Sequence, residues 1–125
     1  MTTEEKQLLL KDLCARLPYG VKAQVQGWDE AKEEEVNIPL KIYSINTDEY
    51  VYFESNDYDV TYYNIDACRL YLRPMSSMTY EEKEELRQTY DWKVFDFYNK
   101  YHFDYRGLIE KGLALEAPEG MYKEE

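Results

Sequence analysis

The sequence has 125 residues, of which 44% are hydrophobic, 16% aromatic and 33% charged, a composition that predicts one folded domain over residues 1–125 and excludes a disordered tail. The 15 Lys and Arg are outnumbered by 26 Asp and Glu, so the net charge of −11 has the wrong sign for direct binding to nucleic acid. No apolar run reaches the roughly 18 residues of a membrane-spanning helix, and no basic leader follows Met1, so we expect a cytoplasmic protein without membrane contacts.

The first predicted element is an amphipathic helix within residues 1–17. Thr2 and Glu5 have the spacing of a capping box, and leucines then recur at steps of three and four residues. Pro18 and Gly20 end this helix, because proline restricts the residue before it and glycine accepts turn conformations that other residues resist.

Residues 21–73 predict a meander of four or five short strands. Apolar and polar residues alternate over 21–26 and 36–43, which is the period of a sheet with one solvated face. Pro39 cannot donate to a ladder and therefore indicates an edge or a bulge. Between these two strands, residues 29–35 carry five carboxylates and one lysine, and we expect a solvated loop there.

Shorter alternating runs complete the meander. Residues 50–54 predict a third strand, and a fourth begins near Val60. Residues 70–72 predict a short fifth strand after a turn, with a helical turn from Asp66 as the alternative.

Residues 79–125 are predicted to be a helical C-terminal part. Thr79 and Glu82 have capping-box spacing, and an apolar stripe at steps of three and four residues predicts a face buried in the core. The stripe consists of Leu86, Tyr90, Val94, Phe97 and Tyr101. Asp91 and Trp92 can interrupt it, which leaves two shorter helices as the alternative.

A last short helix is predicted from Asp104, as its N-cap, to Lys111, with Gly112 as its C-terminal stop. Residues 113–122 then lie over the body or form an edge strand. The order of elements predicts an α+β fold: a small antiparallel curled sheet or SH3-like barrel of four to five strands, flanked by an N-terminal helix and two to three C-terminal helices.

Charge is distributed unevenly along the chain. Residues 29–66 carry eleven acids and two bases, whereas residues 1–28 and 67–125 have net charges of +1 and −3. From residue 46 to 66 six carboxylates occur without any Lys or Arg, together with five tyrosines, whose large contact area and polar tip suit protein interfaces. We therefore expect an acidic, tyrosine-rich face that binds a basic protein and makes the chain a protein-interaction module.

The residues expected to bind this partner are Tyr50, Tyr52, Glu54, Asp57, Tyr58, Asp59 and Arg106. Arg106 belongs to the aromatic stretch 102–106, a composition that favours docking surfaces, although it can instead offset nearby carboxylates. Two alternatives to the interaction face remain: an acidic surface that only solvates the domain, and a DNA-mimic inhibitor that occupies a nucleic-acid-binding host protein. The sequence leaves the oligomeric state open.

Enzymatic motifs are missing from the sequence, which lacks GxGxxG, GxxxxGKS/T, HExxH and GxSxG. His102 is the only histidine, and Cys14 and Cys68 are far apart, so we expect two small buried thiols, no metal site and no cofactor. The protein is predicted not to be an enzyme, and a small hydrolase without a recognisable motif is the remaining alternative.

Three stretches support a resemblance to known proteins: LLLKDLCARLPYGVK, YLRPMSSMTYEEKEE and NKYHFDYRGLIEKGLALEAPEGMYK. Together they resemble a family of small uncharacterised proteins encoded by anaerobic gut bacteria and by their phages and mobile elements. The resemblance covers both ends of the chain and one connector. It implies a bacterial or phage cytoplasmic setting and supplies no catalytic or binding residue.

Overall fold

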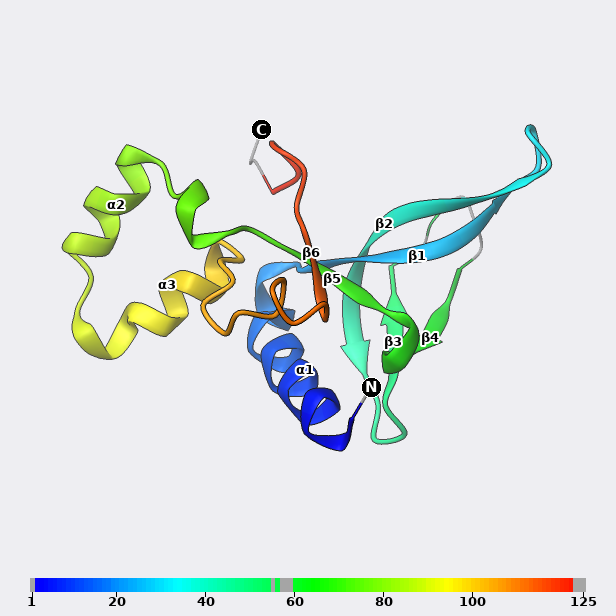
Figure 1. Ribbon diagram of the computed structural model, residues 1–125, viewed down its shortest axis with the longest axis horizontal. Helices are drawn as coiled ribbons and strands as arrows, with labels where there is room; N and C mark the ends of the chain where they lie inside the picture. The colour runs from blue at the N-terminus through cyan, green and yellow to red at the C-terminus, as the bar shows by residue number, and fades with distance from the viewer. Residues whose placement is uncertain (1, 55, 57–59, 123–125) are drawn as a thin grey trace.

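The structure is a computed structural model that describes residues 2–54, 56 and 60–122. It has the predicted α+β class, with an N-terminal helix, a curled six-stranded sheet and C-terminal helices (Figure 1). The helices are α1 (Thr3–Arg16), α2 (Tyr80–Arg87) and α3 (Val94–Lys100). The strands are β1 (Lys22–Asp29), β2 (Glu34–Ile45), β3 (Tyr50–Phe53), β4 (Tyr62–Asn64), β5 (Arg69–Leu72) and β6 (Ala114–Glu116).

The strands follow the order β4-β3-β2-β1-β5-β6 in the sheet. β1 to β4 form consecutive antiparallel hairpins, which confirms the predicted meander. β5 returns to the other side of β1, and β6 adds to β5 in parallel, with Leu70 opposite Ala114. The sheet is therefore a half-barrel with β4 and β6 at its edges, and it has six strands rather than four to five because residues 113–122 supply the edge strand.

α1 forms where the sequence predicts it, because its signals are local. Thr2 N donates to Glu5 Oε1 at 2.9 Å, and Glu5 N donates to Thr2 Oγ1 at 3.0 Å, which completes the capping box. After the helix a 3₁₀ turn leads to Gly20, whose φ of 72° disfavours other residues. A Cβ atom at this position would also meet Lys41 Cε at 2.9 Å, but the end of a lysine side chain can move away, so the positive φ is the main reason for glycine.

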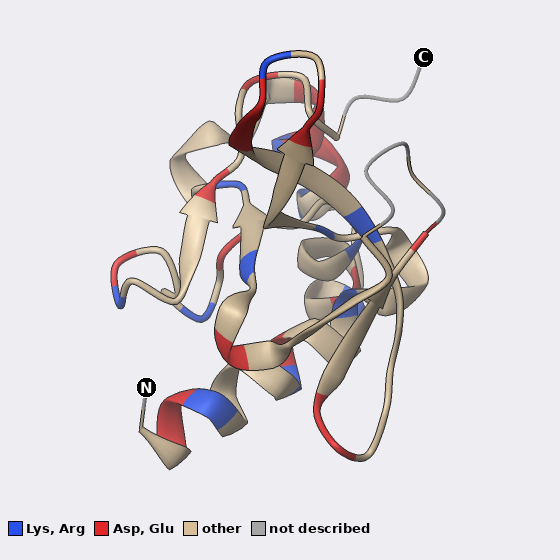
Figure 2. Cartoon of the chain, turned by 90° about the vertical axis from the view of Figure 1, so that its right-hand side faces the viewer, with Lys and Arg blue, Asp and Glu red and all other residues tan. Residues whose placement is uncertain are grey.

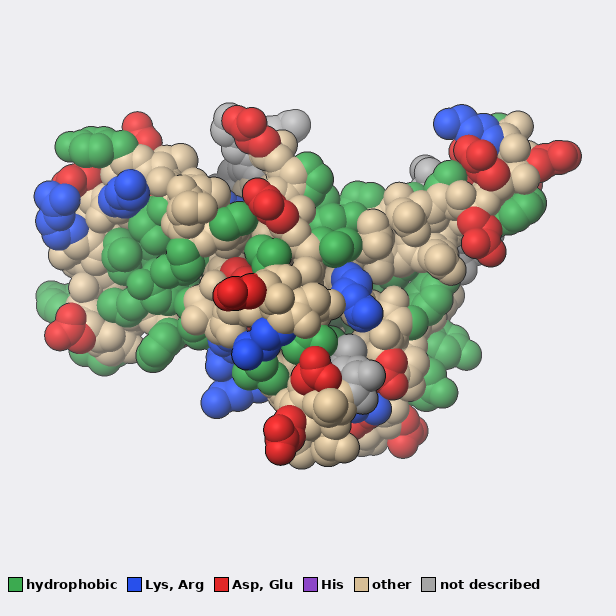
Figure 3. All heavy atoms as spheres, in the orientation of Figure 1, with side chains coloured by type: hydrophobic (Ala, Val, Ile, Leu, Met, Phe, Trp, Pro, Cys, Tyr) green, Lys and Arg blue, Asp and Glu red, His purple; other side chains and the backbone are tan. Residues whose placement is uncertain are grey.

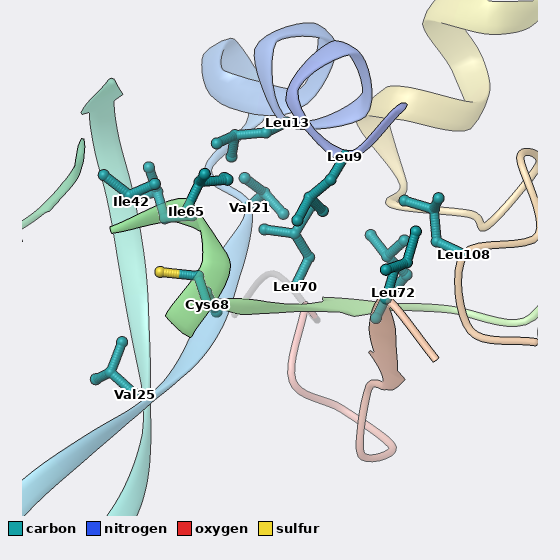
Figure 4. Close-up of a cluster of buried hydrophobic side chains, with 14 of the residues drawn as sticks. Leu9, Leu13, Val21, Val25, Ile42, Ile65, Cys68, Leu70, Leu72 and Leu108 are labelled. Atoms are coloured by element: carbon teal, nitrogen blue, oxygen red, sulfur yellow. The ribbon is translucent and has the colours of Figure 1, made fainter. Parts of the chain in front are cut away.

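The core lies between α1 and the inner face of the sheet (Figure 4). Leu9 and Leu13 of α1 are fully buried against apolar residues of the strands and of the C-terminal segment. These partners include Val21, Val25, Ile42, Ile65, Cys68, Leu70, Leu72 and Leu108. Each fully buried aliphatic side chain stabilises the fold by about 1.5–3 kcal/mol, so this cluster holds α1 on the sheet.

The acidic stretch 29–35 forms the predicted loop over residues 30–33, but its two ends belong to strands. Asp29 ends β1, and β2 begins at Glu34, with Asp29 and Glu34 paired in the ladder. The hairpin projects from the body as a two-stranded ribbon (Figure 1), so its carboxylates stay hydrated and their like charge does not prevent strand pairing. Pro39 lies in β2 before β3 begins to pair at Ile42, which confirms the predicted edge position.

The helical prediction for residues 79–125 holds only for its first half. α2 ends at Arg87, and a 3₁₀ turn precedes α3, so the alternative of two shorter helices is correct. The predicted core stripe is wrong: Phe97 is buried, but Tyr90 is 70% exposed and α2 has no buried residue. Helical periodicity identifies an apolar face without showing whether another element covers it.

No helix forms over residues 104–111. Asp104 is therefore not an N-cap: its carboxylate accepts from Leu108 N at 2.8 Å and from Ile109 N at 3.0 Å, four and five residues further on, and so closes a wider loop. Gly107 has a φ of 72°, and this left-handed residue stops helical propagation at its first turn. The segment instead forms successive turns that lead into β6.

Candidate functional site

Tyrosines line the outer face of the sheet at β3 because the strand alternates between two environments. Val51 and Phe53 are buried in the core, whereas Tyr50 and Tyr52 point to the opposite face. The same alternation in β2 buries Ile42 and leaves Tyr43 exposed. The predicted site residues Tyr50 and Tyr52 thus lie side by side on a solvent-facing surface.

β4 adds a further tyrosine to this surface. Tyr62 pairs directly with Tyr52 across the ladder, and its ring centroid lies 5.3 Å from that of Tyr50 and 5.7 Å from that of Tyr52. Tyr43 continues the row, with its ring 6.5 Å from Tyr52. We call these four residues, Tyr43, Tyr50, Tyr52 and Tyr62, the tyrosine face.

The turn between β2 and β3 fixes the start of this surface. The side-chain oxygen of Asn46 accepts from the backbone N–H groups of Asp48 and Tyr50, both at 3.0 Å. Its amide nitrogen donates to the Tyr52 hydroxyl at 3.3 Å. One asparagine therefore sets both the turn and the orientation of a tyrosine, which is the local chemistry that favours Asn in such turns.

The described residues do not form the continuous acidic face that the sequence predicts. The acidic residues that the structure describes within 29–66 occupy separate parts of the backbone, with one group at the tip of the β1–β2 hairpin (Figure 2). Lys6 of α1 pairs with Glu49 at 2.5 Å and approaches Asp66 at 3.8 Å. Lys6 lies outside residues 46–66, so the absence of Lys and Arg from that stretch does not produce a continuous anionic surface.

Glu54 is the one predicted acidic site residue that the structure describes. It follows Phe53 on the outward side of β3, and its carboxylate lies 3.4 Å from Lys41 Nζ, with about half of each side chain exposed. An exposed pair of this kind contributes only about 0–1 kcal/mol, so a cation of a partner can replace Lys41 at little cost. The predicted site residues Asp57, Tyr58 and Asp59 lie outside the described residues.

Arg106 lies apart from the tyrosine face. Its Nε donates to Asp12 Oδ1 at 3.1 Å, and its Nη2 donates to the Tyr105 hydroxyl at 2.8 Å. Asp12 is completely buried and also accepts from Arg16 Nε at 2.8 Å. This geometry favours the charge-offsetting role of Arg106 over a docking role, because the guanidinium is committed to a buried carboxylate.

His102 is buried at the packing interface between the C-terminal segment and the turn after α1. Its Nε2 lies 3.0 Å from the carbonyl oxygen of Tyr19, so the neutral ring carries its proton on Nε2, and the ring stacks on Tyr122. Burial, reinforced by the nearby guanidinium of Arg16, lowers the pKa of His102 to about 4. Among the described residues, His, Cys, Asp and Glu form no cluster of three or more that could hold a metal ion.

The two cysteines differ, contrary to the prediction that both are buried. Cys14 lies on the exposed side of α1, whereas Cys68 is buried in the core. Burial raises the pKa of the Cys68 thiol to about 12, so this group stays protonated at neutral pH.

A second exposed aromatic cluster lies on the α2–α3 end of the molecule, where sequence reasoning placed a core stripe. Tyr90, Trp92 and Phe95 are 70%, 74% and 63% exposed, and hydrophobic side chains gather at this end (Figure 3). The rings of Tyr90 and Trp92 stack with centroids 6.1 Å apart. The interruption at Asp91 and Trp92 was the sequence feature that could have predicted this exposure, because a continuous buried stripe depends on an unbroken helix.

A cavity of about 270 Å³ opens between β1 and the turn before β5. It is lined mainly by polar side chains, namely those of Gln24, Gln26, Asn37, Tyr63, Asp66 and Arg69. The Tyr63 hydroxyl donates to the Gln26 carbonyl at 2.6 Å and so satisfies a strand carbonyl beyond the end of the β1–β5 ladder. The polar groups of the cavity can hydrogen-bond a small polar molecule. The Tyr63 hydroxyl, however, already donates its hydrogen to the Gln26 carbonyl.

No protein-family model matches the chain, and neither a curated protein nor a solved structure is similar to it. The predicted resemblance to proteins of gut bacteria and phages therefore stays a prediction. Within the part of the chain that the structure describes, none of the helices has the length and apolar character needed to cross a bilayer.

Proposed function

We propose that the chain is a protein-interaction module that binds a basic partner through the tyrosine face. The observation that carries the proposal is the clustering of four tyrosines on the solvent side of a rigid sheet, three of them at least 36% exposed. Tyrosine rings offer large contact areas at a low cost in side-chain entropy, which is why they are enriched in interface cores and paratopes.

The charge of the partner follows from the groups around the tyrosines. Glu54 and Asp48 flank the face, and Glu54 is held only by the exposed contact with Lys41. A guanidinium group stacks on tyrosine rings and forms paired hydrogen bonds with carboxylates, which an ammonium group does less well. The preferred partner therefore presents arginine between apolar side chains.

Sheet rigidity supports the same function. The face is built on paired strands, with Val51 and Phe53 anchored in the core behind it, so the rings need little reordering when a partner binds. Asn46 holds the hydroxyl of Tyr52 in place. The surface is therefore preorganised, which lowers the entropic cost of association.

DNA mimicry is the second candidate and has weaker support. A mimic needs a continuous row of unpaired carboxylates, whereas Glu49, Glu54 and Asp66 each face a lysine. If the partner proves to be a DNA-binding protein, adding the chain should displace DNA with a steep dependence on salt. An unchanged DNA complex at low salt would contradict mimicry and leave the tyrosine-face proposal standing.

Affinity capture with matched baits tests the main proposal. Wild type, the double variant Tyr52→Ser/Tyr62→Ser and the control Tyr80→Ser are immobilised and exposed to one bacterial lysate, since Tyr80 is 74% exposed but lies at the start of α2. We expect a basic protein that is retained by wild type and by the control but lost with the double variant. Identical captured proteins on all three baits would contradict the proposal.

A further inference from the structure

The α2–α3 end carries an apolar surface that the body of the protein does not cover. We define the arm surface as Tyr90, Trp92 and Phe95 together with the charged residues Asp91, Lys93, Asp96 and Lys100. Each of the three aromatic side chains is more than 60% exposed. Tyr90 stacks on Trp92, and Phe95 follows Trp92 by three residues along one helical path, so the rings form one patch.

α3 packs on the body through Phe97, which is buried against Phe103, whereas α2 makes few contacts. α2 is held by Arg73, whose Nη1 donates to Glu82 Oε2 at 2.6 Å, and by the end of α3, where the Tyr101 hydroxyl donates to Glu85 Oε1 at 3.0 Å. α2 itself has eight residues and buries none of them. Helices this short are marginal in water without tertiary packing, so an additional packing partner would stabilise the arm.

The charges of the arm surface indicate what kind of surface can pack against it. In a chain of net charge −11, the stretch from residue 91 to 100 has two acids and two bases and is locally neutral. The signs alternate along it: Asp91, Lys93, Asp96 and Lys100. A surface that carries charges of both signs around an apolar centre can be complementary to a second copy of itself across a two-fold axis. A basic partner would instead find stronger electrostatic attraction at the acidic turns elsewhere in the chain.

We propose that the arm surface is a homodimer interface, in which a second copy of the chain packs against it. The three aromatic side chains have total areas of about 150–250 Å² each and expose roughly two-thirds of this, so they offer about 400 Å² per copy. Two copies would bury about 800 Å² of aromatic surface, and the charged rim adds to it. The total falls near the lower end of specific interfaces, which includes weak complexes, so we expect a weak dimer with a dissociation constant on the order of micromolar.

Sedimentation equilibrium of the full chain tests the dimer over about 1 to 500 µM, the range that brackets such an affinity. Wild type should approach twice the 15.1 kDa chain mass at the highest concentrations. Trp92→Ala should weaken the association by at least about tenfold, since a central aromatic residue commonly dominates an interface. The matched control Trp28→Ala, at a tryptophan that is 54% exposed on β1 and outside both aromatic surfaces, should leave it unchanged.

Charge reversal distinguishes a second copy from any other occupant. A chain with Lys93→Glu and Lys100→Glu has an acidic arm, and one with Asp91→Lys and Asp96→Lys has a basic arm. Each should be monomeric alone because like charges repel, whereas the mixture should form heterodimers at least as tightly as wild type. This result does not depend on which charges face each other, and circular dichroism checks that both variants fold.

Four outcomes would overturn the proposal. One is a wild-type chain that stays monomeric throughout the concentration range. Another is a dimer that Trp92→Ala leaves intact, and a third is a mixture of the two charge variants that stays monomeric. A monomer that binds phosphatidylcholine vesicles through Trp92 would likewise overturn it and assign the arm to a membrane surface. The tyrosine-face proposal is independent of all four, because Tyr43, Tyr50, Tyr52 and Tyr62 belong to other strands.

Discussion

Asp12 is the residue through which α1 is tied to the C-terminal segment. Its buried carboxylate accepts from Arg16 of its own helix and from Arg106, which is distant in sequence. Arg16 in turn donates from Nη2 to the Phe103 carbonyl at 2.6 Å. A buried ion pair adds little net stability when intact, but removal of one partner leaves an uncompensated charge in the interior.

Asp12→Ala should therefore lower the free energy of unfolding by about 3–5 kcal/mol. Arg106→Ala should cost less, because Asp12 keeps both bonds to Arg16. Urea denaturation of the two variants measures these differences, with the exposed Lys93→Ala as the control. If Arg106→Ala kept full stability yet lost partner capture, Arg106 would be a docking residue after all.

His102 predicts that stability depends on pH. The unfolded chain binds a proton at this residue near pH 6.5, whereas the folded protein binds it only near its lowered pKa of about 4. Between these values the unfolded state holds more protons, so the free energy of unfolding falls as the pH drops, by up to about 3 kcal/mol from this residue. Denaturant titrations at intervals across this window measure the loss.

The control for this prediction is His102→Asn, because asparagine tolerates the φ of 61° at this position and does not titrate. The variant should be less stable at neutral pH but show a flatter dependence on pH between about 4 and 6.5. Equal slopes for wild type and variant would show that other groups cause the acid sensitivity.

The two thiols should differ in reactivity. At about pH 8 a thiol-reactive disulfide should modify one cysteine of the native protein, the exposed Cys14, and leave Cys68 unreacted. Cys68 is buried and its pKa is raised to about 12, so both access and thiolate formation are suppressed. Both thiols should react in concentrated guanidinium chloride, and native Cys14→Ser should show none; reaction of both thiols in the native wild type would contradict the assignment.

At the scale of elements, the four residues of β3 divide between the core, which stabilises the fold, and the tyrosine face, which is proposed to bind a partner. Val51 is fully buried on its inner side, whereas the outer side carries Tyr50 and Tyr52. The strand needs the inner side in order to pack on the core, and it leaves the outer side to the solvent. Substitutions on the two sides should therefore have different consequences.

Val51→Ala should lower the free energy of unfolding by about 1.5–3 kcal/mol because it removes buried methyl groups and leaves a cavity. Tyr43→Ala, on the adjacent strand but on the outer side, should change it by less than about 1 kcal/mol, the size of one cross-strand aromatic contact. Chemical denaturation measures both. Equal losses would mean that the tyrosines are core residues and would weaken the proposed binding role.

Elements defined by local signals were predictable from the sequence, and those that depend on distant contacts were not. The capping box of Thr2 and Glu5 and the alternation in β1 involve near neighbours, and both appear as expected. The edge strand β6 was predicted only as one of two alternatives for residues 113–122, because it depends on pairing between Leu70 and Ala114, which are far apart in sequence, and a three-residue run carries little pattern of its own. Gly107 shows another limit, since this left-handed residue interrupts the predicted helix three residues after Asp104, its expected N-cap.

The candidate site was predictable in its tyrosines but not in its electrostatics. Tyr50 and Tyr52 follow from strand alternation together with the core residues between them. The charge of the same segment depends on Lys6 and Lys41, which lie outside residues 46–66 and are brought to it by folding. A count of carboxylates along the chain therefore overstated the acidity of the face.

At the scale of the whole molecule, the two aromatic surfaces lie well apart along the long axis (Figure 1). The α2–α3 arm is at one end, and β3 and β4 are toward the other, with the core and α1 between them (Figure 1). A dimer formed through the arms would keep both tyrosine faces free. Two faces in one assembly would bind a partner with repeated sites more tightly than one, without any new contact.

The central claim is that partner binding takes place on the tyrosine face, and ring resonances of tyrosine report on it directly. Protein labelled with ¹³C in its tyrosine rings is titrated with the captured basic partner and followed by NMR. The resonances of Tyr43, Tyr50, Tyr52 and Tyr62 should shift, while those of Tyr71 and Tyr122, which share a hydrogen bond away from this face, should not. Shifts confined to Tyr80 and Tyr90 on the arm, or no shifts among the four tyrosines at saturation, would contradict the claim.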